Sequence, residues 1–333
     1  MKDHYQSILS AWDIGQVGGV EWLKDSVGLI TVLSGNKFVL KQEQDATEAE
    51  RVGRMARLLA ALDADGVPVL TPIPNRQGHL LTVAMGKCFC LYPFVEWTDT
   101  SKTVGDPADR VRATGAAIAQ LHLALKRHEN LAVMGPMNLV DDVRKWALPR
   151  MRSNALGLEV AEAVEILDRI AQEIPQVCGG LPEQLIHRDS HQANILLRED
   201  CTVVSFVDFE MARRGPRVYD LCYCCTDMLG NAPSSASGTR MRDGQEWGQM
   251  VRGLLDGYQQ VITLAEAEKR AMWHIMLVIQ GAFIAWFCQD ACERANYRTQ
   301  WADSSCVEWA TKNLRMLLWL HANRAYVDQL ARA

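Results

Sequence analysis

The first 95 residues carry short apolar runs that alternate with polar positions and are separated by turn residues. Alternation with a period of two, together with β-branched residues, is typical of strands. These runs predict strands at residues 20–24, 29–33, 38–41, 69–73, 80–83 and 88–95. Apolar positions three and four residues apart predict helices at residues 4–12 and 47–62. We therefore expect a small, strand-rich unit in the N-terminal part of the chain.

After residue 106 the pattern changes and helical spacing dominates. Asp106 is a good N-cap and Pro107 suits the first helical position, so we expect a helix to begin there. Thr263 and Glu266 have the spacing of a capping box and predict the start of a long apolar helix. Further helical patterns cover residues 139–151, 160–174 and 301–330. The rest of the chain is thus predicted to be mainly helical.

Residues 272–288 are nearly all apolar, which raises the question of a membrane span. The stretch has 17 residues, includes His274 and Gln280, and is flanked by charged residues. A transmembrane helix needs about 20 predominantly apolar residues. We therefore predict a buried core helix here, and no membrane partner.

One stretch among the predicted helices returns to strand-like patterning. A short apolar run enters a polar loop, and a second apolar run at residues 195–197 leaves it. A turn and then a β-branched run at residues 203–207 complete the pattern, which predicts a hairpin. Such a hairpin would bring Asn194 and Asp208 to one small site, with Asp189 in the loop before it. The alternative is a chance polar loop between two strands.

These three side chains suit phosphoryl transfer. A carboxylate such as Asp189 can accept the proton of an attacking hydroxyl group. An amide and a carboxylate, Asn194 and Asp208, are hard oxygen ligands of the kind that Mg²⁺ prefers. The transfer of a phosphoryl group to a hydroxyl group needs both functions in one place.

The spacing of these residues resembles a known motif. The chain reads His187-x-Asp189-x4-Asn194 and then Asp208-Phe-Glu210. This resembles the catalytic core of the aminoglycoside phosphotransferases and their relatives, which include choline kinases and homoserine-kinase-like enzymes. Protein kinases, their distant relatives, carry elements with the same spacing. The resemblance implies a kinase that moves the γ-phosphoryl group of ATP to a hydroxyl group.

The resemblance also implies an α+β fold with two lobes, like that of protein kinases. A small β-rich N-lobe, residues 1–95, would cover the nucleotide. A larger, mainly helical C-lobe, residues 96–333, would hold the catalytic hairpin and the acceptor site. The implied cofactors are ATP and Mg²⁺, and a preference for GTP over ATP stays open.

Within the implied site, Asp189 would orient the acceptor hydroxyl and take its proton, while Asn194 and Asp208 hold Mg²⁺. His187 would support the loop by hydrogen bonding rather than react. Arg188 is close enough along the chain to meet a phosphate or the acceptor, and it could equally be structural.

Residues 39–41, Val-Leu-Lys, resemble the third-strand lysine motif of kinases. Lys41 would brace the α- and β-phosphates, and a surface lysine at a strand end is the alternative. A kinase also needs a glutamate to hold this lysine. Glu48 and Glu50 both qualify, and we prefer Glu48 because it lies seven residues before Met55, on the predicted inward face of its helix.

Tyr92-Pro93-Phe94 resembles the crossover between the lobes in this family. Pro93 has no N–H and stiffens the link. Backbone groups beside Tyr92 and Phe94 would then be free for the adenine edge, and a simple exit from a strand is the alternative. Gly28 is a poor version of a Gly-rich phosphate loop, and an ordinary β-turn explains it equally well.

Other motifs in the helical part suggest supporting roles. His122 is predicted to be a satisfied core histidine, and Asp220 to cap and anchor the helix that starts beside it. Residues 230–244 lack any apolar period and are predicted to form a loop over the acceptor site. Five tryptophans crowd the C-terminal region, where they either pack a helical core or form a wall of the acceptor pocket: Trp273, Trp286, Trp301, Trp309 and Trp319.

Composition excludes several function classes. A net charge of −5 over 333 residues gives no basic footprint for nucleic acid. Residues 1–5 lack the apolar core of a signal peptide. The ten cysteines lack the paired spacing of a zinc site. Those at 222–225 and 288–292 lie in helix-like apolar runs, and Cys88 and Cys90 share one face of a predicted strand. We expect free buried thiols and a cytoplasmic protein.

The expected partner is a small-molecule hydroxyl compound, such as an antibiotic, an amino alcohol, a sugar or a homoserine-like acceptor. A Ser or Thr side chain of a peptide or protein is the second hypothesis, and a non-catalytic nucleotide-binding module is the third. Three arginines just after the metal ligand, Arg213, Arg214 and Arg217, favour a neutral or anionic acceptor over a polycation, although they could also form a solvated face.

Overall fold

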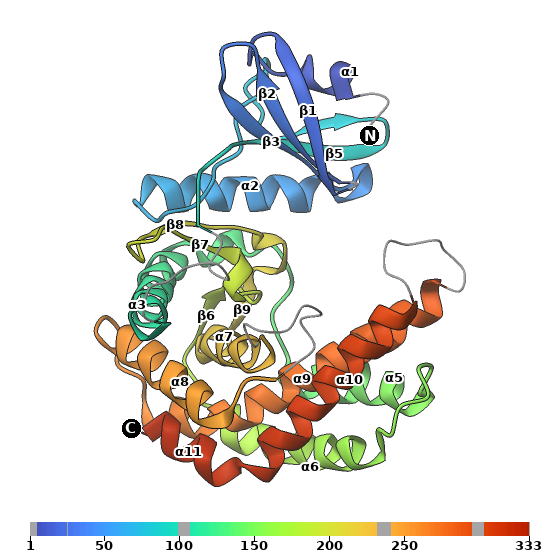
Figure 1. Cartoon of the computed structure of the whole chain (residues 1–333), viewed down its shortest axis with the longest axis vertical. Helices are drawn as coiled ribbons and strands as arrows, with labels where there is room; N and C mark the ends of the chain where they lie inside the picture. The colour runs from blue at the N-terminus through green and yellow to red at the C-terminus, as the bar shows by residue number, and fades with distance from the viewer. Residues whose placement is uncertain (1–4, 25, 99–106, 232–240, 295–302, 333) are drawn as a thin grey trace.

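The computed structural model of the chain describes residues 5–24, 26–98, 107–231, 241–294 and 303–332. An antiparallel sheet built from the N-terminal part lies over a mostly helical remainder, as Figure 1 shows. The α+β, two-lobed fold that the sequence predicts is therefore confirmed. The exact boundary between residues 95 and 96 stays a prediction.

The N-terminal sheet has five strands in the order β1-β2-β3-β5-β4, and every neighbouring pair is antiparallel. The strands are β1 (Val17–Lys24), β2 (Val27–Val32), β3 (Lys37–Asp45), β4 (Thr82–Ala84) and β5 (Lys87–Pro93). Successive side chains of β5 point to opposite faces of the sheet. Cys88 and Cys90 join the apolar cluster of α2 (Ala49–Ala64), whereas Phe89 joins that of α1 (Tyr5–Leu9). The sheet is therefore packed on both sides.

The prediction of a strand at residues 69–73 is wrong. Val69 makes one isolated bridge, to Phe206. Pro72 and Pro74 interrupt the residues after it, because neither proline has an N–H to donate to a strand ladder. The segment instead connects the N-terminal sheet to the hairpin that carries the metal-ligand candidates.

The helical part also holds two small sheets, in which β6 (Glu183–Ile186) pairs with β9 (Arg213–Pro216) and β7 (Ile195–Leu197) pairs with β8 (Val203–Phe206). The β7–β8 pair is the predicted hairpin. The helices are α3 (Pro107–Leu125), α4 (Leu139–Asp141), α5 (Leu148–Ser153), α6 (Ala161–Cys178), α7 (Val218–Gly230), α8 (Gly244–Gln259), α9 (Glu266–Arg294), α10 (Asp303–Ala322) and α11 (Arg324–Arg332). Short helical turns are η1 (Ala46–Glu48), η2 (Lys126–Leu131), η3 (Asp142–Ala147), η4 (Gln192–Asn194) and η5 (Phe209–Met211).

The helix predicted at residues 139–151 is present but not regular. A π-helical turn, η3, separates α4 from α5. Pro149 stands in the first turn of α5 and cannot donate an N–H to the preceding turn. A local change of helical hydrogen bonding of this kind is the usual way that a helix accommodates such a break.

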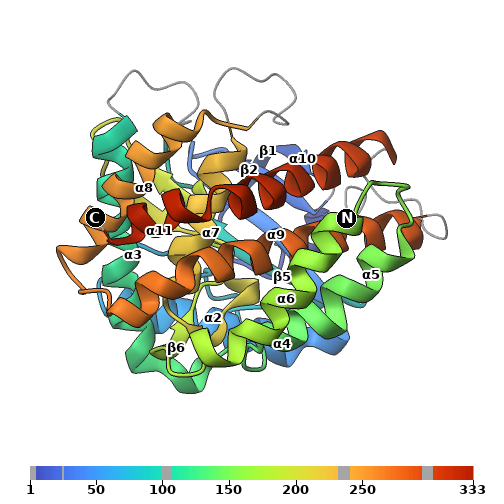
Figure 2. The same ribbon diagram turned by 90° about the horizontal axis from the view of Figure 1, so that it is seen from below.

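Helix α9 runs through the middle of the helical part, in contact with α6, α7 and α10 (Figure 2). Within the part of the chain that the structure describes, one helical stretch, Glu266–Gln289, is long and apolar enough to cross a membrane, and 78% of its 18-residue apolar window is buried by the surrounding protein. The burial agrees with a core helix. The predicted capping box is shifted by two residues, because Glu268 rather than Glu266 accepts the N–H of Ala265 (2.9 Å).

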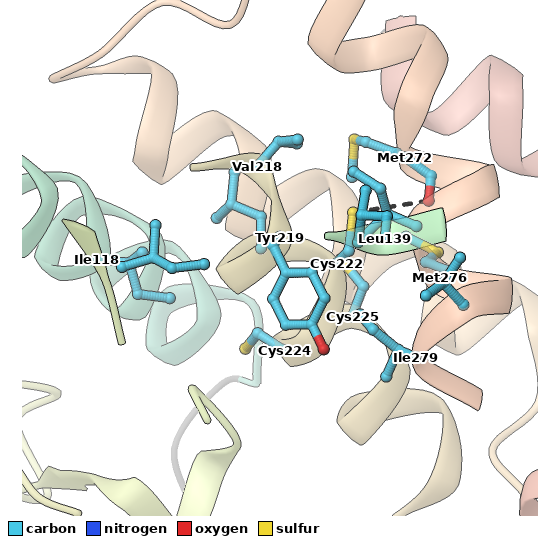
Figure 3. Packing of buried hydrophobic residues seen from close by; sticks show 14 of the residues in the cluster. Ile118, Leu139, Val218, Tyr219, Cys222, Cys224, Cys225, Met272, Met276 and Ile279 are labelled. Carbon is cyan, nitrogen blue, oxygen red and sulfur yellow. Dashed lines mark hydrogen bonds between the residues drawn. The ribbon is translucent and has the colours of Figure 1, made fainter. Parts of the chain in front are cut away.

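Helix α7, which packs on α9, is rich in thiols (Figure 3). Cys222, Cys224 and Cys225 are buried and free, and the Cys222 thiol donates to the Met272 carbonyl at 3.6 Å. Burial raises the pKa of all three thiols. Inert, buried thiols are what the sequence predicts for these positions.

Candidate active site

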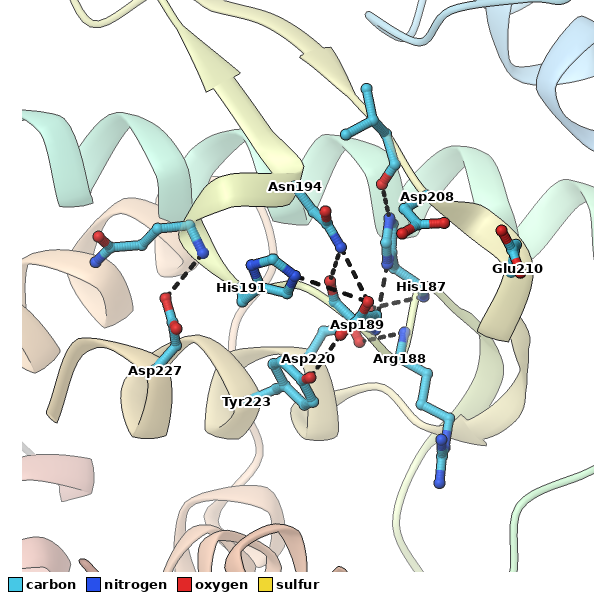
Figure 4. Close-up of polar contacts among 12 residues, drawn as sticks. His187, Arg188, Asp189, His191, Asn194, Asp208, Glu210, Asp220, Tyr223 and Asp227 are labelled. Atoms are coloured by element: carbon cyan, nitrogen blue, oxygen red, sulfur yellow. Dashed lines mark hydrogen bonds and ion pairs between the residues drawn. The ribbon is translucent and has the colours of Figure 1, made fainter. Parts of the chain in front are cut away.

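The loop between β6 and η4 has a strained backbone that a single carboxylate holds in place. Arg188 adopts φ 68°, a left-handed conformation that is costly for a side chain of this size. The carboxylate of Asp220 accepts the N–H of His187 (2.9 Å) and the N–H of Arg188 (2.7 Å). Ser190 donates its hydroxyl to the Asp220 carbonyl (2.7 Å). Figure 4 shows Asp220 beside His187 and Arg188.

Asp220 therefore has a different task from the predicted one. It lies in the first turn of α7, but its side chain does not cap that helix. It is completely buried, and the ring of His122 stands 3.0 Å from its Oδ2 atom. Burial raises the pKa of Asp220, but His122 and the loop N–H groups outweigh burial and leave the pKa lowered. The prediction for His122, a satisfied core histidine, is confirmed, since its other nitrogen meets Tyr258 at 3.0 Å.

Asp189 projects from this loop with both carboxylate oxygens engaged. Tyr223 of α7 donates its hydroxyl to Oδ1 (2.5 Å), and Asn194 donates its amide to Oδ2 (3.0 Å). Burial and the neighbouring Asp189 raise the pKa of Tyr223, so the phenol stays a donor. The two donors fix the direction of the carboxylate. Each oxygen keeps a second lone pair that can accept a hydroxyl proton.

His187 and Arg188 serve the loop rather than the space beside Asp189. His187 Nε2 bonds the Val207 carbonyl (2.9 Å), and its Nδ1 accepts the N–H of Asp189 (3.2 Å). The guanidinium of Arg188 extends away from Asp189, as Figure 4 shows, and lies 3.8 Å from Asp142. The structure therefore does not bring the Arg188 side chain into the site.

Asn194 and Asp208 stand at the two ends of the β7–β8 hairpin, as predicted. The Asn194 amide nitrogen also donates to the Asp189 carbonyl (2.9 Å), so its amide oxygen is left for another partner. Asp208 has a left-handed backbone (φ 68°) and a side chain that is 42% exposed. An amide oxygen and a carboxylate, with no larger cluster of acidic, histidine or cysteine side chains among the described residues, fit Mg²⁺, which takes few protein ligands.

Lys41 of β3 reaches this hairpin from the sheet. Its ammonium lies 3.1 Å from Asp208, 2.7 Å from Glu210 and 3.1 Å from Glu43. Burial lowers the pKa of Lys41, but the three carboxylates outweigh it and hold the pKa well above its ordinary value. Burial also raises the pKa of Asp208, but Lys41 more than offsets this and leaves it lowered. Lys41 is therefore a permanent cation.

The prediction that Glu48 or Glu50 pairs with Lys41 is wrong. Glu48 accepts from Arg51 (2.9 Å), and Glu50 accepts from Arg54 (3.0 Å). The partner that β3 supplies is Glu43, because residues two apart on a strand point to the same face. Its side chain is fully buried, and Tyr92 donates to its Oε1 atom at 2.7 Å. Burial raises the pKa of Glu43 to about 7, although Lys41 and Tyr92 oppose the shift.

A cavity of about 380 Å³ opens between the sheet and the hairpin. Its polar end holds Lys41, Asn194 and Asp208, and its walls are mostly apolar. Tyr92 and Phe94 line it, as predicted, although the Phe94 N–H is not free because it donates to the Lys37 carbonyl (3.2 Å). Gly28 lies in β2 against the ring of Trp22, which favours an ordinary structural role over a phosphate loop.

A second cavity of about 410 Å³ lies on the other side of Asp189. Helices α7, α9 and α10 form it, and Asp189, His191 and Asp227 line its floor. Trp286 and Trp309 line it as well, together with Phe283, Phe287, Gln280 and Lys312. Core packing is one expectation for the tryptophans, and Trp273 meets it. A wall of the cavity is the other, and Trp286 and Trp309 meet that one. Trp301 lies outside the described residues.

Comparison with known proteins agrees with this geometry. The model of the phosphotransferase enzyme family matches residues 26–261, well over half of the chain. The chain belongs to this family. It is therefore an enzyme, a phosphotransferase with an alcohol group as acceptor.

Among relatives of this phosphotransferase, a homoserine kinase from Neisseria meningitidis serogroup B is 25% identical over 279 residues, which cover 80% of this chain and 82% of that protein. A microcompartment-associated aminopropanol kinase has a similar structure, with a TM-score of 0.72 at 16% identity, covering 98% and 99% of the two chains. The amicoumacin kinase hAmiN, solved with AMP-PNP and Ca²⁺, has a TM-score of 0.66 at 15% identity. The match covers 98% of this chain and 93% of that one.

The arginines expected near the acceptor of the phosphotransferase do not line the second cavity. Arg214 pairs with Glu129 (2.7 Å), and Arg217 pairs with Glu268 (2.7 Å). Arg213 is partly buried against Arg188 and Asp142. The prediction that these arginines lie near the acceptor is therefore wrong, although Lys312 places a cation in the second cavity. The loop predicted over the acceptor lies largely outside the described residues, at 232–240, and so does the predicted N-cap, Asp106.

Proposed function

We propose that this phosphotransferase is a kinase that uses ATP and Mg²⁺ to phosphorylate a hydroxyl group of a small molecule. The observation that carries the proposal is the position of Asp189 between the two cavities. Asp189 lines the second cavity, and its Oδ2 atom is 3.0 Å from the Asn194 amide, which lines the first. A nucleotide in the first cavity and an acceptor in the second would therefore meet at this carboxylate.

The first cavity suits a nucleoside triphosphate. Apolar walls beside Tyr92 and Phe94 can take a base, and Lys41 can take phosphate oxygens at the opposite end. Asn194 and Asp208 would hold Mg²⁺, which neutralises charge on the transferred group. The amicoumacin kinase, whose fold is similar, was solved with AMP-PNP.

In the proposed reaction the acceptor oxygen forms a bond to the γ-phosphorus, and the bond from that phosphorus to the bridging oxygen breaks. ADP leaves, and the hydroxyl proton passes to the carboxylate of Asp189. Tyr223 and Asn194 hold that carboxylate in one orientation, which raises the fraction of encounters with the correct geometry. His187 and Asp220 keep the loop in its strained conformation.

The acceptor is proposed to be a small amino alcohol or hydroxy amino acid. The homoserine kinases and the aminopropanol kinase named above act on compounds of this kind by their names. The second cavity, at about 410 Å³, is large enough for such a molecule and has aromatic walls that would exclude water. A Ser or Thr side chain of a peptide is the alternative acceptor.

The test is a screen for phosphorylated product by mass spectrometry, with Mg²⁺ and ATP or GTP. The acceptors are amino alcohols, hydroxy amino acids, sugars, aminoglycosides and Ser- or Thr-containing peptides. We expect turnover with the first two classes, none without Mg²⁺, and almost none with Asp189→Asn. Turnover confined to peptides would favour the alternative, and ATP hydrolysis without any phosphorylated acceptor would contradict the proposal.

A further inference from the structure

The second cavity contains one buried cation, Lys312 of α10. Only 6% of this residue is exposed. Its Nζ atom lies 3.8 Å from the centre of the Trp309 ring and 3.4 Å from the Gly230 carbonyl. Among the residues described as lining this cavity, it is the sole lysine, and no arginine joins it. A lysine is costly to bury, so its presence in a cavity calls for a role.

Asp227 of α7 is a carboxylate that attracts Lys312 through space. Asp227 accepts the backbone N–H of Gln192 (2.9 Å) and the amide of Asn231 (2.6 Å), so neutral donors hold it at the floor of the cavity. Its attraction does not make up for the burial of Lys312, whose pKa stays lowered. A ligand carboxylate in the cavity would supply the further negative charge that stabilises this ammonium.

A second side chain in the same cavity points to a polar ligand. Gln280 of α9 is 1% exposed, and its Oε1 atom has no hydrogen-bond partner among the described residues. A buried amide oxygen without a donor costs free energy comparable to a lost hydrogen bond. An ammonium or hydroxyl group of a ligand would satisfy it.

We propose that the acceptor is a small hydroxy compound with a carboxylate, and that Lys312 binds this carboxylate. This proposal rests on the proposed function and adds the class of the acceptor. The carboxylate lies against Lys312, the hydroxyl group lies against Asp189, and a ligand ammonium faces Gln280 and the aromatic walls. A polycation is rejected, because it would place like charge against a buried ammonium.

The test compares two acceptors that differ only in the carboxylate, L-homoserine and 3-aminopropan-1-ol. Loss of one charge-assisted hydrogen bond corresponds to about 10–100-fold in affinity. We therefore expect Lys312→Met to raise the KM for L-homoserine by about 10–100-fold, with little change for 3-aminopropan-1-ol and none for ATP. Lys312→Arg should retain most of the affinity. Lys145→Met, which removes an exposed lysine of η3, is the control for general loss of charge.

A pH profile separates carboxylate binding from a structural role. Burial lowers the pKa of Lys312 to about 8, against the attraction of Asp227. The other titratable groups lining the cavity are Asp189, His191 and Tyr223. For wild type, kcat/KM for L-homoserine should fall as the pH rises through about 8, while Lys312→Arg should move this limb to higher pH. An unchanged limb in that variant would overturn the assignment.

Binding can also be measured without catalysis. Trp286 and Trp309 line the cavity, so tryptophan fluorescence should report a titration with L-homoserine or with 4-hydroxybutyrate, which keeps the carboxylate and lacks the ammonium. Lys312→Met should weaken the binding of both acids. An equal effect on 3-aminopropan-1-ol, which lacks the carboxylate, or no effect on any of the three, would overturn the inference. If wild type binds L-homoserine through Lys312 but phosphorylates nothing, the proposed function fails, while the assignment of Lys312 as a carboxylate-binding residue stands.

Discussion

The two cavities on either side of Asp189 handle charge in different ways. In the first cavity, three carboxylates lie within 3.1 Å of the Lys41 ammonium and hold it at one place. In the second cavity, Lys312 lies on an aromatic ring and Asp227 bonds neutral donors. A cation held by several carboxylates suits a ligand that is the same in every turnover. A buried cation against an aromatic wall instead attracts anionic groups of an acceptor and repels cationic ones, so it contributes to selectivity among acceptors.

The difference also lies in how the chain builds each cavity. The polar end of the first one comes from a hairpin of adjacent strands and one lysine on β3. The second comes from three helices, α7 and the consecutive pair α9 and α10, and α8 separates α7 from that pair along the chain. Changes in the two regions should therefore have separable effects, with Asp189 as the shared element.

The largest expected effect is that of Asp189→Asn, at the residue that joins the two cavities. We expect kcat to fall by about 10²–10⁴, the usual contribution of a positioned base. The Kd for Mg·ATP should stay within about twofold, because the nucleotide cavity keeps its residues. Steady-state kinetics measures the change in kcat, and calorimetry measures the Kd for Mg·ATP. Near-wild-type turnover of the true acceptor would remove Asp189 from the role of base.

Glu43→Gln tests the Lys41–Glu43 pair of the first cavity through the pH dependence of the free energy of unfolding. The pKa of Glu43 is raised from 4.5 to about 7, so ionising this buried carboxyl disfavours the folded state. No such penalty exists below the unfolded pKa, near 4.5, and it is complete above about 7. Relative to wild type, the variant should therefore gain stability as the pH rises between these values, by roughly 3 kcal/mol at most.

Urea unfolding at several pH values measures this difference. Glu48→Gln is the matched control, because the Glu48 carboxylate is 46% exposed and pairs with Arg51 of α2, and it should show no such trend. The same slope in both variants, or a slope in neither, would mean that burial does not raise the pKa of Glu43 in the folded protein.

Asp208→Ala should weaken binding in the nucleotide cavity and leave binding in the second cavity unchanged. The variant loses a proposed metal ligand and one of the three carboxylates around Lys41. We expect the affinity for Mg·ATP to fall by about 10–100-fold, as for a lost bond to a charged group. Binding of L-homoserine followed by fluorescence should not change. If ATP binds equally well with and without Mg²⁺ in wild type and variant, Asp208 is not a metal ligand.

The smallest expected effect is a change in hydrogen exchange when Mg·ATP binds. The sheet carries Lys41 and the hairpin carries Asp208, and both must meet one triphosphate. Protection should rise together in β2, β3, the crossover at residues 90–96 and the segment 187–210. It should rise much less in α11. Protection confined to the C-terminal helices would mean that the nucleotide binds in the second cavity.

The sequence predicted the first cavity better than the second, for a physical reason. His187, Asp189, Asn194 and Asp208 lie within 22 residues, so a local hairpin fixes their arrangement. The exception is Lys41, whose partner Glu43 was missed because the expectation followed the kinase pattern of a helical glutamate. The i, i+2 spacing on a predicted strand could have indicated it.

The residues of the second cavity carry no local motif. Tyr223, Asp227, Gln280 and Lys312 are single polar residues in apolar helices, and only packing brings them together. A period of 3.6 predicts that a helix is present but not which neighbour faces it. The strand predicted at residues 69–73 failed for a related reason, because prolines outweighed its apolar pattern.

Helix α7 has a consequence for how this enzyme could acquire a new acceptor. Its first turn supplies Asp220 to the strained loop, and its next turn supplies Tyr223 to Asp189. Mutations on this helix should rarely survive, since most of them disturb chemistry that every acceptor needs. The cavity-lining positions of α9 and α10, such as Gln280 and Lys312, carry no such duty. Natural or laboratory selection for a different acceptor should therefore accumulate its substitutions on these two helices and leave α7 unchanged.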